Sequence, residues 1–174
     1  MTLQNSNPLA NLFVRYFSNI QGTHLIEMQY QYATADAILI LSGTTKLVEH
    51  KDRNNSCIHY DSALLEKQKF DSLSAVNKLL GMDLLFVMEY PEVVMLYSLS
   101  PNPDHYDWFE LKCPADKNQT YEKDKIVTYL PYSQARIISK KTWREVDFQV
   151  FHEWWTVQKE KASLEVLQWA SQQN

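Results

Sequence analysis

The C-terminal segment, residues 142–170, constrains the fold most, because its apolar side chains recur at the spacing of a single long helix. Thr142 and Glu145 have the spacing of a capping box, in which each side chain satisfies a free backbone N–H at a helix start. At about 1.5 Å per residue, a helix over this segment would be about 42 Å long. Four of the five tryptophans lie in the segment: Trp143, Trp154, Trp155 and Trp169.

Upstream of this segment, the hydrophobic period changes several times between that of a helix and that of a strand. The spacing predicts helices over residues 8–20 and 63–80, the first capped by Asn7 and the second ended by Gly81. Alternation and short apolar runs predict strands over residues 24–32, 37–48 with a bend at Gly43, 57–60, 84–89, 92–99, 107–112 and 126–130. Because strands follow strands through short turns, we expect an α+β fold with helices packed on a mostly antiparallel sheet. No linker-like stretch interrupts the chain, so we expect one domain over residues 1–174.

The composition excludes several classes of function. Seventeen basic and twenty-one acidic residues give a net charge of −4, which provides no long-range attraction for phosphate backbones or anionic lipid. The three glycines lie far apart, so no glycine-rich loop can wrap a phosphate. No apolar run approaches the roughly 18 residues of a membrane-spanning helix, and the N-terminus has no signal-peptide pattern. We therefore expect a cytoplasmic protein with two reduced thiols, Cys57 and Cys113.

The aromatic side chains of the C-terminal segment allow two interpretations. They pack on the sheet as the main core, or part of their wide arc stays exposed in the monomer and binds another chain. Trp154 and Trp155 project about 100° apart on a helix, so both are buried only where the helix is covered on two sides. The second interpretation predicts a partner-binding surface of four residues: Phe151, Trp154, Trp155 and Trp169.

No catalytic motif stands out in the sequence, and this favours a protein–protein interaction module without a cofactor. Adaptors, small chaperones and assembly or regulatory factors are often mildly acidic, aromatic-rich α+β domains of this size. We expect such a module to bind a protein partner and to form a homodimer. Cys57 and His59 share one face of an expected strand, but a tetrahedral zinc site needs four such ligands.

The main alternative is a metal-dependent enzyme built around Glu110-Leu111-Lys112. On a strand, Glu110 and Lys112 point to the same side, and Glu92 on an earlier strand of a possible hairpin brings a second carboxylate nearby. Glu92 and Glu110 would then hold Mg²⁺, while Glu110 and Lys112 would be the catalytic pair. Two carboxylates on Mg²⁺, with a lysine that orients or activates water, suit the hydrolysis of a phosphodiester.

Over roughly residues 62–113, this pattern resembles that of the PD-(D/E)xK nuclease superfamily. The resemblance implies a divalent-metal nuclease, and it gives Glu66 the role of the carboxylate that this fold often carries on its first helix. The chain departs from the superfamily pattern by having glutamate after Pro91, where aspartate is usual, and by lacking a strongly basic face. Glu49-His50-Lys51 matches the same tripeptide, so the tripeptide alone does not select a site. Without a metal, Glu110 and Lys112 form an exposed ion pair that contributes little to stability.

A further alternative is a nucleic-acid-binding accessory protein. Two aromatic side chains, Tyr132 and Trp143, lie close to a cluster of basic residues that precedes the last expected helix: Arg136, Lys140, Lys141 and Arg144. Aromatic rings beside cations can stack on bases while the cations bind phosphates. The acidic net charge makes this less favoured than protein binding.

Overall fold

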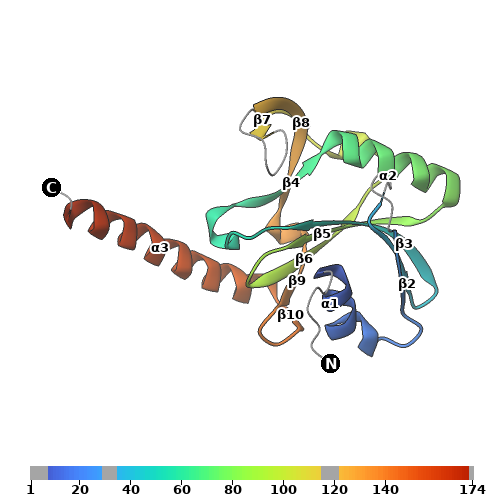
Figure 1. The fold of residues 1–174 in the computed structure, drawn as a ribbon, viewed down its shortest axis with the longest axis horizontal. Helices are drawn as coiled ribbons and strands as arrows, with labels where there is room; N and C mark the ends of the chain where they lie inside the picture. The colour runs from blue at the N-terminus through green and yellow to red at the C-terminus, as the bar shows by residue number, and fades with distance from the viewer. Residues whose placement is uncertain (1–7, 29–34, 115–121, 173–174) are drawn as a thin grey trace.

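The structure of the protein is a computed structural model that describes residues 8–28, 35–114 and 122–172. Its strands form two sheets (Figure 1). The larger sheet has the order β1-β2-β3-β5-β6-β9-β10, and its strands are β1 His24–Glu27, β2 Ala37–Leu41, β3 Thr44–Asp52, β5 Asp83–Glu89, β6 Val93–Leu99, β9 Arg136–Ser139 and β10 Arg144–Val146. The smaller sheet has the order β4-β8-β7, and its strands are β4 Ser62–Glu66, β7 Phe109–Pro114 and β8 Glu122–Pro131.

The helices of the described residues are α1 Pro8–Arg15, α2 Lys67–Leu80 and α3 Phe148–Gln172. Short 3₁₀ turns, η1 Phe17–Asn19, η2 Cys57–His59, η3 Pro103–His105 and η4 Tyr132–Gln134, connect some of the elements. The predicted α+β class, with a mostly antiparallel sheet and a long C-terminal helix, is confirmed. In the described part of the chain, no helix has the length and apolar character needed to cross a membrane.

Helices cover the larger sheet on both faces (Figure 1). Alternate residues of each central strand belong to different hydrophobic clusters, because successive side chains of a strand point to opposite faces. On one face, Leu47 of β3 packs in a cluster with Phe70 of α2. On the other face, Val48 packs in a cluster with Leu12 of α1. The central strands are therefore buried on both sides, which explains their nearly continuous apolar runs.

The β2–β3 connection is a tight hairpin where the sequence indicated only a bend. Ser42 and Gly43 both have positive φ, 48° and 84°, and Leu41 pairs with Thr44 across the turn. Two-residue hairpin loops favour positive φ because it matches the twist of the flanking strands. The hairpin sets the register of β2 on β3, and this register positions the candidate site.

Strands β3 and β5 are parallel neighbours, the one parallel pair among the described strands. Parallel strands need a crossover connection, and here residues 53–82 supply it through β4 and α2. The sequence predicted a helix that begins near residue 63, but residues 62–66 form β4 instead. Ala63 and Leu65 are buried on one face of β4, and the strand pairs with β8, so a long-range sheet contact overrides the local helical spacing.

Helix α3 begins later than the sequence indicated. Asp147, not Thr142, caps it: its Oδ1 accepts a hydrogen bond of 2.8 Å from the backbone N–H of Gln149. Thr142 lies in the β9–β10 turn, where Trp143 has a φ of +53°. The predicted capping box is therefore wrong, because the residues that would have formed it belong to a β-hairpin.

The first turns of α3 pack on the body of the protein, and the rest of the helix extends away from it (Figure 1). Phe151 is buried, while Trp155 is half-buried and donates a hydrogen bond of 3.2 Å from Nε1 to the carbonyl oxygen of Cys57. Trp154 remains 37% exposed, and the side chain of Trp169 lies outside the described residues. The aromatic arc is thus divided between core and surface along the helix.

Candidate functional site

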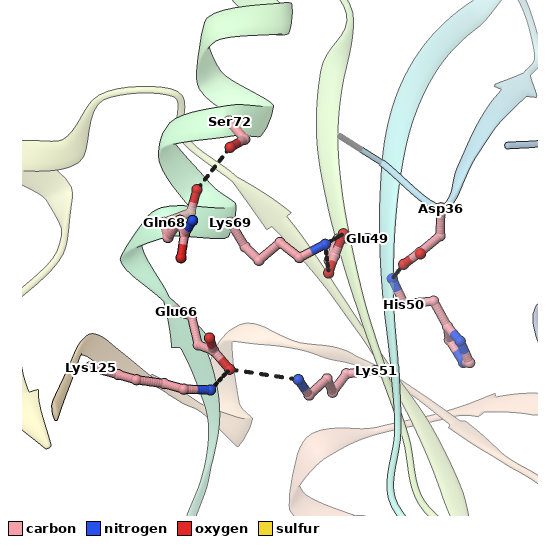
Figure 2. A network of polar contacts seen from close by, with 9 residues as sticks. All are labelled: Asp36, Glu49, His50, Lys51, Glu66, Gln68, Lys69, Ser72 and Lys125. Atoms are coloured by element: carbon pink, nitrogen blue, oxygen red, sulfur yellow. Dashed lines mark hydrogen bonds and ion pairs between the residues drawn. The ribbon is translucent and has the colours of Figure 1, made fainter. Parts of the chain in front are cut away.

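Two carboxylates, Asp36 and Glu49, lie opposite each other where β2 begins and β3 ends, and Lys51 follows on the same strand (Figure 2). Ala37 is the register partner of Val48, so Asp36, just before β2, lies opposite Glu49. Asp36 Oδ2 accepts a hydrogen bond of 2.7 Å from the backbone N–H of His50. Glu49 and Lys51 are two residues apart on β3 and therefore share one face of the sheet, the face that α2 covers.

Glu49 is a buried carboxylate with a like charge beside it. Only 6% of the surface of Glu49 is exposed to solvent. Burial raises the pKa of Glu49, the negative charge of Asp36 raises it further, and the nearby lysines lower it only in part. The cation in direct contact is Lys69 of α2, whose Nζ lies 3.1 Å from Glu49 Oε1. The side chain of Lys69 is 46% exposed, so solvent screens its attraction to Glu49.

A second carboxylate, Glu66, holds two lysines at the entrance to α2 (Figure 2). Glu66 Oε1 lies 2.9 Å from Lys125 Nζ of β8 and 3.7 Å from Lys51 Nζ. Burial alone would raise the pKa of Glu66, but the hydrogen bond from Lys125 and the charges of the lysines outweigh it and lower the pKa. Glu66 is therefore ionised at neutral pH and directs the ammonium of Lys51 toward itself.

The residue between Glu49 and Lys51 points to the opposite face of the sheet. His50 Nε2 lies 3.0 Å from Glu89 Oε2, and Lys140 Nζ lies 2.6 Å from Glu89 Oε1. Burial alone would raise the pKa of Glu89, but the hydrogen bonds from His50 and Lys140 lower it. This polar group therefore packs on the face of β3 opposite to Glu49 and Lys51.

The donor set is compatible with a divalent cation of the hard, oxygen-seeking kind. Asp36 is exposed and Glu49 is buried, and the repulsion between their charges is what a bound cation would relieve. Within the described ranges, no three His, Cys, Asp or Glu side chains gather closely enough to hold a metal alone. Mg²⁺ fits such a site, because it is commonly bound through one or two carboxylates and keeps several waters or substrate oxygens.

The residues named by the sequence pattern lie in two different places. Glu110 and Lys112 are exposed on β7 of the smaller sheet. Glu92 lies in the β5–β6 turn of the larger sheet, where its Oε2 accepts a hydrogen bond of 3.2 Å from the backbone N–H of Cys57. The structure therefore does not gather Glu92 and Glu110 on one hairpin. Glu66, which the resemblance also named, does join a cluster, but the partner tripeptide is Glu49-His50-Lys51.

Sequence reasoning missed Asp36, Lys69 and Lys125. The signal available for Asp36 was its place directly before a buried apolar strand that turns back through Gly43 into the strand of Glu49. Lys69 lies on α2 and Lys125 lies on β8, and no local sequence pattern predicts the contact of either lysine with the site.

Two of the four basic residues of the cluster before α3 are neutralised by ion pairs. Arg136 forms an ion pair of 2.7 Å with Glu145, and Lys140 is held by Glu89. Lys141 and Arg144 remain exposed. The site predicted there for an accessory nucleic-acid-binding protein thus retains only part of its charge.

A scan against protein-family models and a search of curated proteins found no match to this chain. A search of solved structures found a similarity to Archaeoglobus fulgidus Hjc, a Holliday junction resolvase from an archaeal hyperthermophile. The two share 11% sequence identity with a TM-score of 0.43, over 79% of this chain and 94% of that one. A likeness at this level leaves the function of this chain to be argued from its own side chains.

The first interpretation of the sequence, an interaction module with no evident catalytic site, is wrong. The buried Glu49, with Asp36 opposite it and Lys51 on the same strand, is a candidate catalytic site that the interpretation did not foresee. The expected protein partner and homodimer gain no support from the structure and stay predictions. Phe151 and Trp155 of the expected partner surface serve the core of the protein.

Proposed function

We propose that the protein is a divalent-metal-dependent nuclease that hydrolyses phosphodiester bonds at Asp36, Glu49 and Lys51. One observation carries the proposal: Glu49 is buried beside the like charge of Asp36, with Lys51 on the same strand face. Such an arrangement is unfavourable without a counter-charge, and a cation that binds there would supply it.

Each side chain then has a distinct task. Asp36 and Glu49 would hold the cation, which when bound would polarise the phosphoryl group and lower the pKa of a water. Lys51, held by Glu66, would orient the water that attacks phosphorus. The water oxygen bonds to phosphorus, the ester P–O bond breaks, and the leaving oxygen takes up a proton. Lys69 neutralises Glu49 and, being half-exposed, can turn to solvent when a divalent cation takes over that role.

Lysines near the proposed site can contact the phosphates of a substrate. A groove of about 450 Å³ beside Glu66 is lined from α2 and β8. It contains three lysines, Lys67, Lys123 and Lys125, and three carboxylates, Glu66, Asp71 and Asp124. Lys67 is paired with Asp71, whereas Lys51 and Lys69 lie nearer to Glu49 and add two cations beside the proposed site. Local cations of this kind can bind phosphates even on an acidic protein, because exposed charges farther away are screened by salt.

Cleavage of labelled single- and double-stranded DNA and RNA tests the proposal. We expect hydrolysis with Mg²⁺ or Mn²⁺ and none with EDTA. Glu49→Gln, Asp36→Asn and Lys51→Ala should each reduce the rate by about 100-fold or more, as removal of a directly acting group commonly does. Glu160→Gln, a change of the same kind at an exposed position on α3, is the matched control and should cleave like the wild type.

Glu110→Gln separates the proposed site from the one that the sequence pattern named. If Glu110→Gln abolished cleavage while Glu49→Gln retained it, the catalytic carboxylate would lie on β7 and the proposal would be wrong. Metal-independent cleavage, or no cleavage of any of these substrates by wild-type protein, would also contradict it.

A further inference from the structure

A mixed aromatic and basic pocket lies next to the proposed site along β3. Glu49 and Lys51 alternate with residues of the opposite face, and Arg53 continues the same alternation just past the end of the strand. The backbone N–H of Arg53 still donates to the carbonyl oxygen of Glu89, 2.8 Å away, so the pairing with β5 extends to this residue. Arg53 lines a pocket of about 530 Å³ together with Tyr60 and Tyr129.

The two tyrosines present their rings to this pocket from rigid supports. Tyr129 on β8 is 49% exposed and packs against Phe109 of β7, with ring centroids 5.0 Å apart. Tyr60 packs against the buried Tyr90, with centroids 5.9 Å apart, and its hydroxyl accepts a hydrogen bond from Asn55. Each ring therefore has one side fixed by a neighbour and little side-chain freedom to lose when a ligand binds.

The register of the smaller sheet connects this pocket to the lysines of the proposed site. Tyr129 pairs with Leu64, and Val127 pairs with Glu66, so Tyr129, Lys125 and Glu66 lie on one face of that sheet. Tyr129 and Lys125 are four residues apart, or about 13 Å along the strand. The aromatic pocket and the lysine-lined groove are thus two parts of one surface on either side of the Glu66–Lys51 pair.

The charges on this surface suit a phosphate backbone. The acidic residue that lines the pocket, Asp61, forms an ion pair with Lys159 of α3. In the groove, Glu66 is shared between Lys51 and Lys125, Asp71 is paired with Lys67, and Asp124 is exposed. Arg53 is half-buried at the pocket wall, with a guanidinium that can bind a phosphate through two donors.

We propose that the pocket bounded by Arg53, Tyr60 and Tyr129 binds an unpaired base of a single-stranded nucleic acid. The base stacks on the exposed ring of Tyr129, and its phosphate lies toward Arg53 and Lys51. Paired bases cannot reach the ring, because a duplex keeps both of their faces stacked inside the helix. This inference rests on the proposed function for the identity of the ligand, and it specifies a substrate with a single-stranded segment beside the bond to be cleaved.

Fluorescence polarisation with a short labelled oligothymidylate, and with the same strand in a duplex, tests this inference. The measurements are made in EDTA so that no strand is hydrolysed. We expect Tyr129→Ala to weaken single-strand binding about 5-fold or more and to leave duplex binding unchanged. Tyr129→Phe keeps the aromatic face and should bind like the wild type. Arg53→Ala should weaken binding and lower the dependence of log affinity on log salt by about one.

The inference is overturned if Tyr129→Ala, with an unchanged circular dichroism spectrum, binds the single strand as tightly as the wild type. It is also overturned if single strand and duplex lose affinity equally. Failure here is distinguishable from failure of the proposed function. Binding that depends on Tyr129, in a protein that cleaves nothing, would retain the pocket and reject the nuclease. Metal-dependent cleavage that is unchanged in Tyr129→Ala, with unchanged single-strand binding, would retain the nuclease and reject the pocket.

Discussion

Replacing Glu49 with glutamine is expected to make the metal-free protein more stable at neutral pH, although the change removes an ion pair. Glu49 is 6% exposed and lies beside the charge of Asp36. Its raised pKa is the net result of burial, of the repulsion from Asp36 and of the attraction from Lys69 and Lys51. Folding therefore disfavours the charged form of this side chain relative to the unfolded chain, and glutamine is uncharged at every pH.

The size of the effect depends on the shift in pKa. Each pKa unit by which folding raises a carboxyl group costs about 1.4 kcal/mol of stability once the group is ionised. The lost pair with Lys69 is already counted in that shift, and for a partner that is 46% exposed it contributes about 1 kcal/mol or less. In a domain of this length, about 1 kcal/mol changes the Tm by about 2–4 °C.

The pH dependence has a definite sign. Below the ordinary Glu value of 4.5, the carboxyl is protonated in both the folded and the unfolded chain, and glutamine offers no advantage. As the pH rises through the raised pKa of Glu49, the wild type loses stability that the variant keeps. The Tm difference should thus be largest near neutral pH and should shrink as the solution is acidified.

Divalent metal should reverse this order. A ligand that binds only the folded state at about 100 times its Kd adds about 2.7 kcal/mol, or about 5–10 °C in Tm here. Thermal unfolding with and without Mg²⁺ should show that shift for the wild type and for Glu160→Gln, but not for Glu49→Gln. The reasoning is refuted if metal-free Glu49→Gln unfolds at a lower temperature than the wild type at pH 7, or if the variant keeps the Mg²⁺ shift.

One further substitution and one thiol modification test the buried Glu89 and the buried Cys57. Glu89→Gln should destabilise the protein by about 2–4 kcal/mol at pH 7, because buried Glu89 loses charge-assisted bonds from His50 and Lys140. Its lowered pKa means that this stability is present above the ordinary carboxyl value and is lost as the pH falls through the folded value, so urea midpoints of variant and wild type should converge in acid. Burial, with the charge of Glu92, raises the pKa of Cys57 to about 12. A disulfide reagent should therefore modify half-buried Cys113 in the native protein and Cys57 only after denaturation. Reaction of both thiols in the native protein would contradict this.

Local sequence was sufficient where burial alone decides the structure. The apolar runs at residues 84–89 and 93–99 form central strands, as their composition indicates. Gly81 ends α2 with a φ of 66°, in the left-handed conformation that favours glycine at a helix end. These features depend on a few neighbouring residues, and their physical cause can be read without knowledge of the rest of the chain.

Local sequence failed where a distant segment completes the structure. Residues 62–66 have a helical spacing when taken together with residues 67–80, but β8 supplies the hydrogen bonds that make them a strand. Residues 57–60 alternate like a strand, yet Cys57–His59 forms a 3₁₀ turn, and the carbonyl of Cys57 accepts a hydrogen bond from Trp155 of α3. In both cases the deciding partner lies far away in the chain.

The candidate site illustrates the same limit in its sharpest form. Glu49-His50-Lys51 and Glu110-Leu111-Lys112 are equivalent as patterns, and each puts a carboxylate and an ammonium on one strand face. They differ in what surrounds them: Glu49 is buried in the larger sheet, whereas Glu110 is exposed on the smaller one. The β2–β3 hairpin brings Asp36 opposite Glu49, and the crossover through α2 brings Lys69 into contact with Glu49. Because of these two connections, only Glu49-His50-Lys51 has a second carboxylate close to a buried one. A motif this short therefore acquires its chemical meaning from the register of the sheet that carries it, and a search for such sites should ask first which strand is buried.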